Sequence, residues 1–178
     1  MKYVTLLRGI NVGGNMIIKM TDLKTAVENC GFTNVSTYIQ SGNIIFESNE
    51  KDNSIITAKL ENGLLQSLNY NSRIFVRTYQ QLKTILSNVP ADWKKRKDMR
   101  CYLAFVKEPA TAADVIRELE LKEGVDFVKA GEGVVYMSTV LSGLTKSGFT
   151  KLINKKVYKN ITIRNYNTCQ KIIARMEL

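Results

Sequence analysis

The most informative stretch of the chain, residues 35–46, reads Val35-Ser36-Thr37-Tyr38-Ile39-Gln40-Ser41-Gly42-Asn43-Ile44-Ile45-Phe46. Its first six residues alternate in the period-two pattern of a strand, and Ile44–Phe46 form a second, apolar run. The residues Ser41-Gly42-Asn43 between them predict a tight turn, because glycine adopts the positive φ that such a turn needs. We therefore expect an antiparallel hairpin here.

Apolar residues at helical and strand spacing extend the pattern on both sides of this hairpin. Before it, we expect a strand at 3–7 and then a helix that Thr21 caps and Gly31 ends. After it, the expected elements are a helix at 53–68, a strand at 73–77, and a short helix that begins with the capping-box pair Thr78 and Gln81. The first half of the chain therefore reads β-α-β-β-α-β-α.

The same order is expected in the second half, after a break that contains Pro90 and a basic run. It begins with a strand at 101–106 and a helix capped by Thr111 and Asp114, followed by strands at 125–129 and 134–138 around the turn Gly131-Glu132-Gly133. A helix at 146–154 and a strand at 161–164 come next. The final helix is capped by Asn167 and Gln170 and carries Cys169, Ile172, Ile173 and Met176 on one face. Two tight hairpins favour antiparallel sheets over a parallel α/β fold.

The order β-α-β-β-α-β is that of the split βαβ, or ferredoxin-like, unit. We therefore expect an α+β protein with two tandem ferredoxin-like subdomains, each an antiparallel sheet with helices packed on one face. The expected limits are an N-terminal subdomain with a glycine-rich loop at 1–90, a basic linker at 91–98, and a C-terminal subdomain with basic C-terminal helices at 99–178.

The chain contains no histidine, which restricts the chemistry that it can perform. Histidine is the commonest general base near neutral pH, so Ser-His-Asp and Cys-His nucleophile systems are excluded. Cys30, Cys101 and Cys169 are far apart and form no Cys-x-x-Cys pair. We expect buried thiols at Cys30 and Cys169 and no metal site, while the cofactor and the presence of enzymatic activity stay open.

Positive charge is concentrated in two parts of the chain, which has a net charge of +10. Residues 143–178 contain eight Lys or Arg residues and one acid, Glu177, and the second cluster is Lys94-Lys95-Arg96-Lys97. Charge gathered in this way attracts phosphates, nucleotides or RNA. The alternative is a solvated, lysine-rich face that keeps the protein soluble.

Neither a membrane span nor a signal peptide is indicated. The longest apolar runs, such as Val134–Met137, are far shorter than the ~20 residues that cross a bilayer. Arg8 interrupts the first apolar run too early for the core of a signal peptide. We expect a cytoplasmic protein without a membrane partner.

The loop from Arg8 to Gly14 lies between the first expected strand and the first helix. Backbone N–H groups at such a junction can point at a phosphate, helped by the helix dipole. Arg8 adds a bidentate guanidinium, and Lys19 lies just before the helix. The glycine spacing fits neither a Walker loop nor a dinucleotide fingerprint, so a loop that only turns the chain is the alternative.

Several motifs resemble those of a known family. They are Leu6-Leu7-Arg8-Gly9-Ile10-Asn11-Val12-Gly13-Gly14, Lys19-Met20 with Asp22-Leu23, Thr37-Tyr38-Ile39-Gln40-Ser41-Gly42-Asn43, and later stretches at 145–152 and 161–168. Together they resemble a bacterial family catalogued as domain of unknown function 1697, over nearly the whole chain. The resemblance implies a two-subdomain α+β fold and no particular activity.

These motifs place polar residues in loops, where binding residues often lie. The candidate ligand-binding residues are Arg8, Asn11, Gly13, Gly14, Lys19, Ser41, Gly42, Asn43, Arg164 and Asn165. As a set they predict an anion pocket. For single members such as Asn11, Ser41 and Asn43, the alternative role is to cap turns.

Three functions are consistent with the sequence. The first is binding or turnover of a phosphorylated small molecule or nucleotide, at the Arg8–Gly14 loop together with Ser41-Gly42-Asn43. The second is an RNA- or DNA-binding module that uses the Lys94–Lys97 run and the basic C-terminal third. On the expected sheet of the C-terminal unit, Tyr102 and Tyr136 could stack bases or instead pack between the two halves of the chain. The third is a structural or protein-interaction role through sheet edges, and the oligomeric state stays open.

Overall fold

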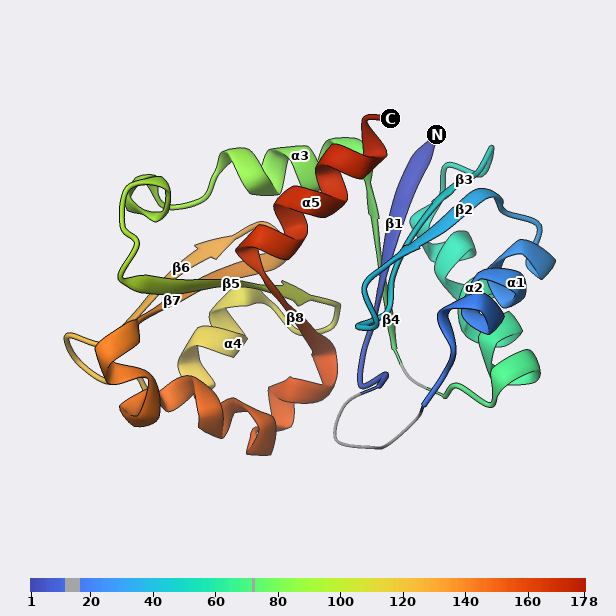
Figure 1. The fold of residues 1–178 in the computed structure, drawn as a ribbon. Helices are drawn as coiled ribbons and strands as arrows, with labels where there is room; N and C mark the ends of the chain where they lie inside the picture. The colour runs from blue at the N-terminus through green and yellow to red at the C-terminus, as the bar shows by residue number, and fades with distance from the viewer. Residues whose placement is uncertain (12–16, 72) are drawn as a thin grey trace. The chain divides into compact units, whose positions relative to one another are not determined.

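The hairpin expected at residues 35–46 is present in the computed structural model, which describes residues 1–11, 17–71 and 73–178 (Figure 1). Its strands are β2 (Thr33–Tyr38) and β3 (Asn43–Glu47), which pair antiparallel with Thr37 opposite Ile44. Gly42, in the turn between them, has a φ of +70°. The turn therefore has the left-handed residue that the sequence predicts.

The chain divides into two compact units. The first unit consists of Met1–Lys83 with Lys171–Leu178, and the second unit is Thr84–Gln170. In the first unit β1 (Lys2–Leu7) and β4 (Ile74–Thr78) join the hairpin in an antiparallel sheet of order β2-β3-β1-β4. This is the strand order of a ferredoxin-like unit, and it confirms the predicted fold class.

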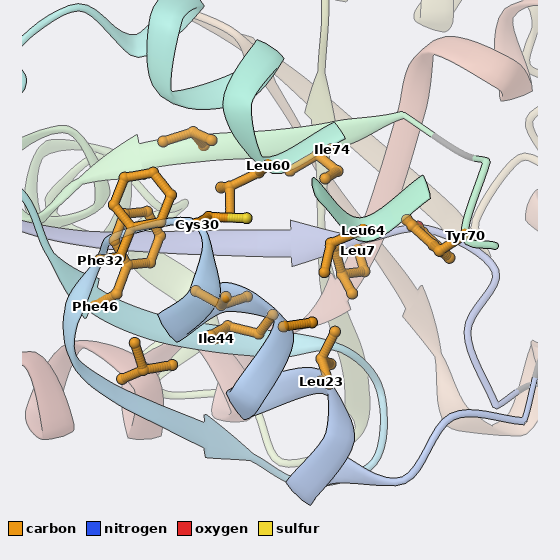
Figure 2. Close-up of a cluster of buried hydrophobic side chains, with 14 of the residues drawn as sticks. Leu7, Leu23, Cys30, Phe32, Ile44, Phe46, Leu60, Leu64, Tyr70 and Ile74 are labelled. Carbon is orange, nitrogen blue, oxygen red and sulfur yellow. The ribbon is translucent and has the colours of Figure 1, made fainter. Parts of the chain in front are cut away.

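Helices α1 (Met20–Asn29) and α2 (Asn53–Leu68) cover one face of this sheet (Figure 1). Figure 2 shows the core that they enclose, in which Leu23 from α1 and Leu60 and Leu64 from α2 pack against the sheet. The rings of Phe32 and Phe46 pack with centroids 4.6 Å apart. Burial of these apolar side chains is the main term that holds the unit together.

The N-termini of these two helices are capped differently. The bounds of α2 are those predicted, and Asp52 caps it by accepting a hydrogen bond from the Ser54 N–H at 2.7 Å. The predicted cap of α1 is wrong, since the helix begins at Met20 and Lys19 occupies the cap position. The hydroxyl of Thr21 donates instead to the Asp22 carboxylate at 3.2 Å.

The second unit repeats the strand order. Its strands are β5 (Met99–Val106), β6 (Asp126–Gly131), β7 (Val134–Val140) and β8 (Ile161–Asn165), in an antiparallel sheet of order β6-β7-β5-β8. Helix α4 (Ala112–Glu118) begins with the capping box predicted for Thr111 and Asp114, and Val115 from this helix packs in the core with Val135 and Leu152. The two sheets therefore have one topology, as the hairpins predict.

The second crossover of this unit differs from the prediction. In place of an α-helix at 146–154, the chain forms three 3-10 helices, η2 (Leu141–Lys146), η3 (Gly148–Asn154) and η4 (Lys156–Asn160). The Asp126 carboxylate accepts hydrogen bonds from the Ser147 hydroxyl at 2.6 Å and from the Gly148 N–H at 2.8 Å. These bonds hold Ser147 in an extended conformation, which separates η2 from η3.

The limits of the two units differ from those expected at 1–90, 91–98 and 99–178. The boundary falls inside α3 (Tyr79–Ser87), and the last residues of α5 (Tyr166–Met176) belong to the first unit. There the Tyr79 hydroxyl donates to the Glu177 carboxylate at 3.0 Å, and the Arg175 guanidinium lies 4.8 Å from the ring centroid of Tyr38. The C-terminus therefore completes the first unit. Within the described residues, no helix is long and apolar enough to cross a membrane.

Four carboxylates of the second unit have lowered pKa values, and two of them, Glu120 and Asp126, lie at the η2–η4 crossover or bind to it. Hydrogen bonds from the ammonium groups of Lys151, at 2.7 Å, and Lys155, at 2.5 Å, lower the pKa of Glu120 to about 2. Burial raises the pKa of Asp126, but the hydrogen bonds that it accepts, first among them that from Ser147, outweigh burial and lower its pKa overall. Both groups therefore favour folding in their ionised form.

Acid should therefore destabilise the second unit in a defined pH range. A carboxyl whose pKa is lower in the folded state contributes stability above its unfolded pKa and loses it as the pH falls toward the folded pKa. For Glu120 this range runs from pH 4.5 down to about 2. We expect Glu120→Gln to reduce the loss of stability across this range, measured as the urea midpoint against pH. Glu132→Gln, in the exposed hairpin turn, is the control, and equal curves for both variants would contradict the assignment.

Candidate functional site

The two glycine-containing turns of the first unit lie against each other. The Leu7 N–H donates to the Gly42 carbonyl at 2.8 Å, and the Asn11 side-chain N–H donates to the Gln40 carbonyl at 3.0 Å. A Cβ added at Gly42 would lie 2.7 Å from the Leu7 Cβ. The described part of the Arg8–Gly14 loop is thus in contact with the Ser41-Gly42-Asn43 turn. A ligand site that uses both segments requires this contact.

The amides of this cluster are used to hold the backbone. Asn11 accepts from the Ile18 N–H at 2.8 Å and donates to the Ile18 carbonyl at 3.0 Å. Asn43 is buried, and its amide donates to the Tyr38 carbonyl at 3.0 Å and to the Ser41 hydroxyl at 2.9 Å. These contacts give Asn11, Ser41 and Asn43 roles in fixing the turns.

The remaining predicted residues of the first unit lie around the same loop. Tyr70 fixes the backbone of Arg8, because its hydroxyl accepts from the Arg8 N–H at 2.8 Å and donates to the Arg8 carbonyl at 2.7 Å. Lys19 is exposed at the start of α1. Gly13 and Gly14 lie outside the described residues.

Arg164 and Asn165 lie in β8 of the second unit. Arg164 is buried, and its guanidinium donates to the Thr162 hydroxyl at 2.9 Å and to the Ile163 carbonyl at 3.0 Å. Asn165 accepts a hydrogen bond from the Asn167 N–H at 2.9 Å. Asn165 therefore caps the start of α5, a role that the sequence assigns to Asn167 and Gln170.

A pocket of about 620 Å³ lies in the second unit, next to Asn165. Its lining residues are Trp93, Lys94, Arg96, Lys97, Met99, Arg100, Cys101, Leu141, Asn165, Tyr166, Asn167 and Gln170. Four of them are cations, and none of these lining residues is a carboxylate. We call it the basic pocket.

Trp93 anchors the segment that carries most of these cations. Its side chain is buried in the second unit, with its ring edge-on to Tyr136 at 6.0 Å and to Tyr166 at 5.3 Å. The Tyr136 hydroxyl in turn donates to the Ile85 carbonyl at 2.9 Å. Residues 91–94 form the 3-10 helix η1, so this part of the expected linker is packed into the unit.

The cations of the basic pocket differ in their partners. The Arg96 guanidinium makes two hydrogen bonds to the Asp98 carboxylate, at 3.0 and 2.6 Å. Across the part of the chain that the structure describes, no salt bridge involves Lys94, Lys97 or Arg100. The positive charge of these three side chains is therefore available to an anionic ligand.

The pocket lining suits binding better than covalent chemistry. Burial and the nearby Asp92 raise the pKa of the Cys101 thiol to about 11, so the thiol stays protonated at neutral pH. A protonated thiol is a weak nucleophile. No group of three or more Cys, Asp or Glu residues that could hold a metal ion is found among the described residues.

Tyr102 and Tyr136 lie on opposite faces of the second sheet. Tyr102 pairs with Met137 and Leu103 with Tyr136, and side chains that are paired across strands share a face. Tyr102 packs against the core beneath α4, whereas Tyr136 contacts Trp93. The two rings therefore cannot form one platform for stacked bases.

Sequence reasoning missed most of the basic pocket. The sequence marks Asn165 as a candidate ligand-binding residue and Lys94–Lys97 as a charge cluster, but no pattern in it links Arg100, Asn167 or Gln170 to them. The available signal was Trp93, the only tryptophan of the chain, inside a run that otherwise reads as a linker. A tryptophan in such a place indicates a buried anchor.

The family described as "Protein of unknown function (DUF1697)" matches residues 1–136. The chain belongs to this family. Its fold is similar to that of a solved structure described as "The structure of conserved bacterial protein SP0830 from Streptococcus pneumoniae". The two are 29% identical, with a TM-score of 0.83 and 98% of each chain covered. No curated protein matches the chain. The family resemblance seen in the sequence is thereby confirmed.

The contact between the two turns of the first unit predicts a large effect at one glycine. In Gly42→Ala, the new methyl group would lie 2.6 Å from Ile10 and 2.7 Å from Leu7, at a φ of +70°. Overpacking and the left-handed conformation together should cost about 2–4 kcal/mol of unfolding free energy.

Gly9→Ala is the matched control, because Gly9 has a φ of +69° and, its two chain neighbours aside, no atom of the described residues lies within 4 Å of a Cβ added there. It should cost only about 1 kcal/mol. Urea unfolding of both variants measures the difference. Equal destabilisation would show that the close approach of the two turns does not contribute.

Proposed function

We propose that the protein binds a phosphorylated small molecule or nucleotide, with the phosphate at the cations of the basic pocket. The observation that supports this proposal is a single pocket lined by Lys94, Arg96, Lys97 and Arg100 and by no described carboxylate. Cations gathered in one concave site attract anions more strongly than the same charges spread over a flat surface.

The chemistry of the lining favours a phosphate group. Arg100 offers the planar donor fork that matches phosphate oxygens, and Lys94 and Lys97 add flexible ammonium groups. Charge-assisted hydrogen bonds of this kind are about twice as strong as neutral ones. The volume of about 620 Å³ lies in the range of small-molecule sites, roughly 300–1,000 Å³, so the ligand extends beyond one phosphate.

The site in this proposal differs from the one inferred from the glycine motifs. A phosphate at the Arg8–Gly14 loop stays a prediction, because Gly13 and Gly14 lie outside the described residues. The described contacts of Asn11 and Asn43 engage their amides in the turns. The basic pocket is made of described residues throughout, and it therefore carries the proposal.

Neighbouring lysines allow a matched test. Lys95 and Lys97 are both exposed and belong to the same run, but only Lys97 lines the basic pocket. We expect Lys97→Ala and Arg100→Ala each to weaken the binding of adenosine 5′-monophosphate (AMP) about tenfold, because each removes a charge-assisted hydrogen bond. Lys95→Ala should change the affinity less than about twofold, because Lys95 lies outside the lining and acts on a bound ligand only at long range, where salt screens its charge. Isothermal titration calorimetry at moderate salt measures all three.

Two results would contradict the proposal. Equal weakening by all three variants, with an affinity for short RNA that falls steeply with salt, would indicate a diffuse basic surface for nucleic acid instead. If AMP, ribose 5-phosphate and pyrophosphate all failed to bind at millimolar concentration, the proposal that the ligand contains a phosphate group would be wrong.

A further inference from the structure

We infer that the ligand of the basic pocket is a nucleoside phosphate, whose base is recognised by the amide side chains at the start of α5. This inference rests on the proposed function and narrows it, because it excludes inorganic phosphates and simple sugar phosphates as the preferred ligands. It follows from the part of the pocket lining that carries no charge.

The lining comes from two chain segments with different chemistry. The segment from η1 into β5 supplies all four cations. The junction of β8 and α5 supplies three amides, Asn165, Asn167 and Gln170. A ligand that uses both segments needs an anionic part and a neutral part rich in hydrogen-bond donors and acceptors.

Strand pairing separates these two parts along the sheet. Asn165 on β8 lies opposite Tyr102 on β5, and Arg100 is two residues earlier on β5. Two residues of a strand span about 7 Å. A nucleoside phosphate has a matching layout, because its ribose separates the base from the 5′-phosphate.

The amides on α5 are placed to read the edge of a base. Asn167 and Gln170 are exposed and three residues apart, which puts them on the same side of the helix. The Gln170 amide donates to the Tyr166 hydroxyl at 3.1 Å, and this bond orients the group. Asn and Gln amides present a donor and an acceptor side by side, the arrangement that pairs with an adenine edge.

Apolar side chains complete the uncharged part of the pocket. Met99 and Leu141 line it, and Leu141, although a large hydrophobic residue, is 42% exposed. The Leu141 N–H donates to the Asp98 carbonyl at 2.8 Å, which holds this leucine beside the start of β5. The flat face of a base would cover such apolar surface, whereas inorganic phosphate would leave it in water.

The test compares a nucleotide with its base-free counterpart on the full chain. We expect AMP to bind at least about tenfold more tightly than ribose 5-phosphate, measured by calorimetry. In the double variant Asn167→Ala/Gln170→Ala, the affinity for AMP should fall about tenfold, whereas that for ribose 5-phosphate should stay within twofold. Asn154→Ala, an exposed amide outside the pocket, is the control and should change neither affinity.

Trp93 supplies an independent readout, because it is the only tryptophan of the chain and lines the pocket. AMP should change its fluorescence in the unsubstituted protein, with a midpoint at the calorimetric Kd. Circular dichroism shows whether the double variant keeps the fold. If the double variant does not fold, the single variant Asn167→Ala is used in its place.

Each other outcome has a distinct meaning. Equal affinities for AMP and ribose 5-phosphate, both reduced by Arg100→Ala, would overturn the base inference and leave the proposed function standing. A preference for AMP that survives the double variant would also overturn it, because the base would then be recognised by other residues. Binding of neither ligand would overturn the proposed function and this inference together.

Discussion

Trp93 is 6% exposed and packs edge-on against Tyr136 and Tyr166. Withdrawing so large a ring would return a large apolar area to water, so this contact fixes the course of the chain between η1 and β5. The cations of the basic pocket follow Trp93 within seven residues along the chain. One aromatic contact therefore converts a run of lysines and arginines, which would otherwise be a solvated tail, into the wall of a pocket.

Gathering these cations has an energetic cost that bears on the function. Like charges in one concave site repel each other and oppose compact folding. The Arg96–Asp98 pair relieves part of this repulsion, and an anionic ligand would relieve more. A site of this kind is stabilised by its ligand, and its selectivity then depends on its uncharged residues, which discriminate between anions of equal charge.

Local patterns predicted the fold well but did not indicate the basic pocket. The turn at Gly42, the bounds of α2 and the capping boxes at Thr78 and Thr111 depend on neighbouring residues, and all were predicted correctly. The η2–η4 crossover was mispredicted as a helix because Asp126, about twenty residues away, binds Ser147 and Gly148. The basic pocket likewise depends on distant contacts, those of Trp93 with Tyr136 and Tyr166. The sequence showed its charges but not the packing that brings them to the amides of α5.

The first unit is built from both ends of the described chain, and this has a consequence for how the protein folds during synthesis. Residues 171–178 belong to this unit, where Glu177 binds the Tyr79 hydroxyl and Arg175 lies over the ring of Tyr38. Chains usually begin to fold on the ribosome from the N-terminus, one domain after another. Here the first unit can assemble its sheet early, but it reaches its final form only after the entire second unit has been synthesised. A nascent chain arrested before residue 171 would therefore hold an N-terminal unit that lacks its closing segment.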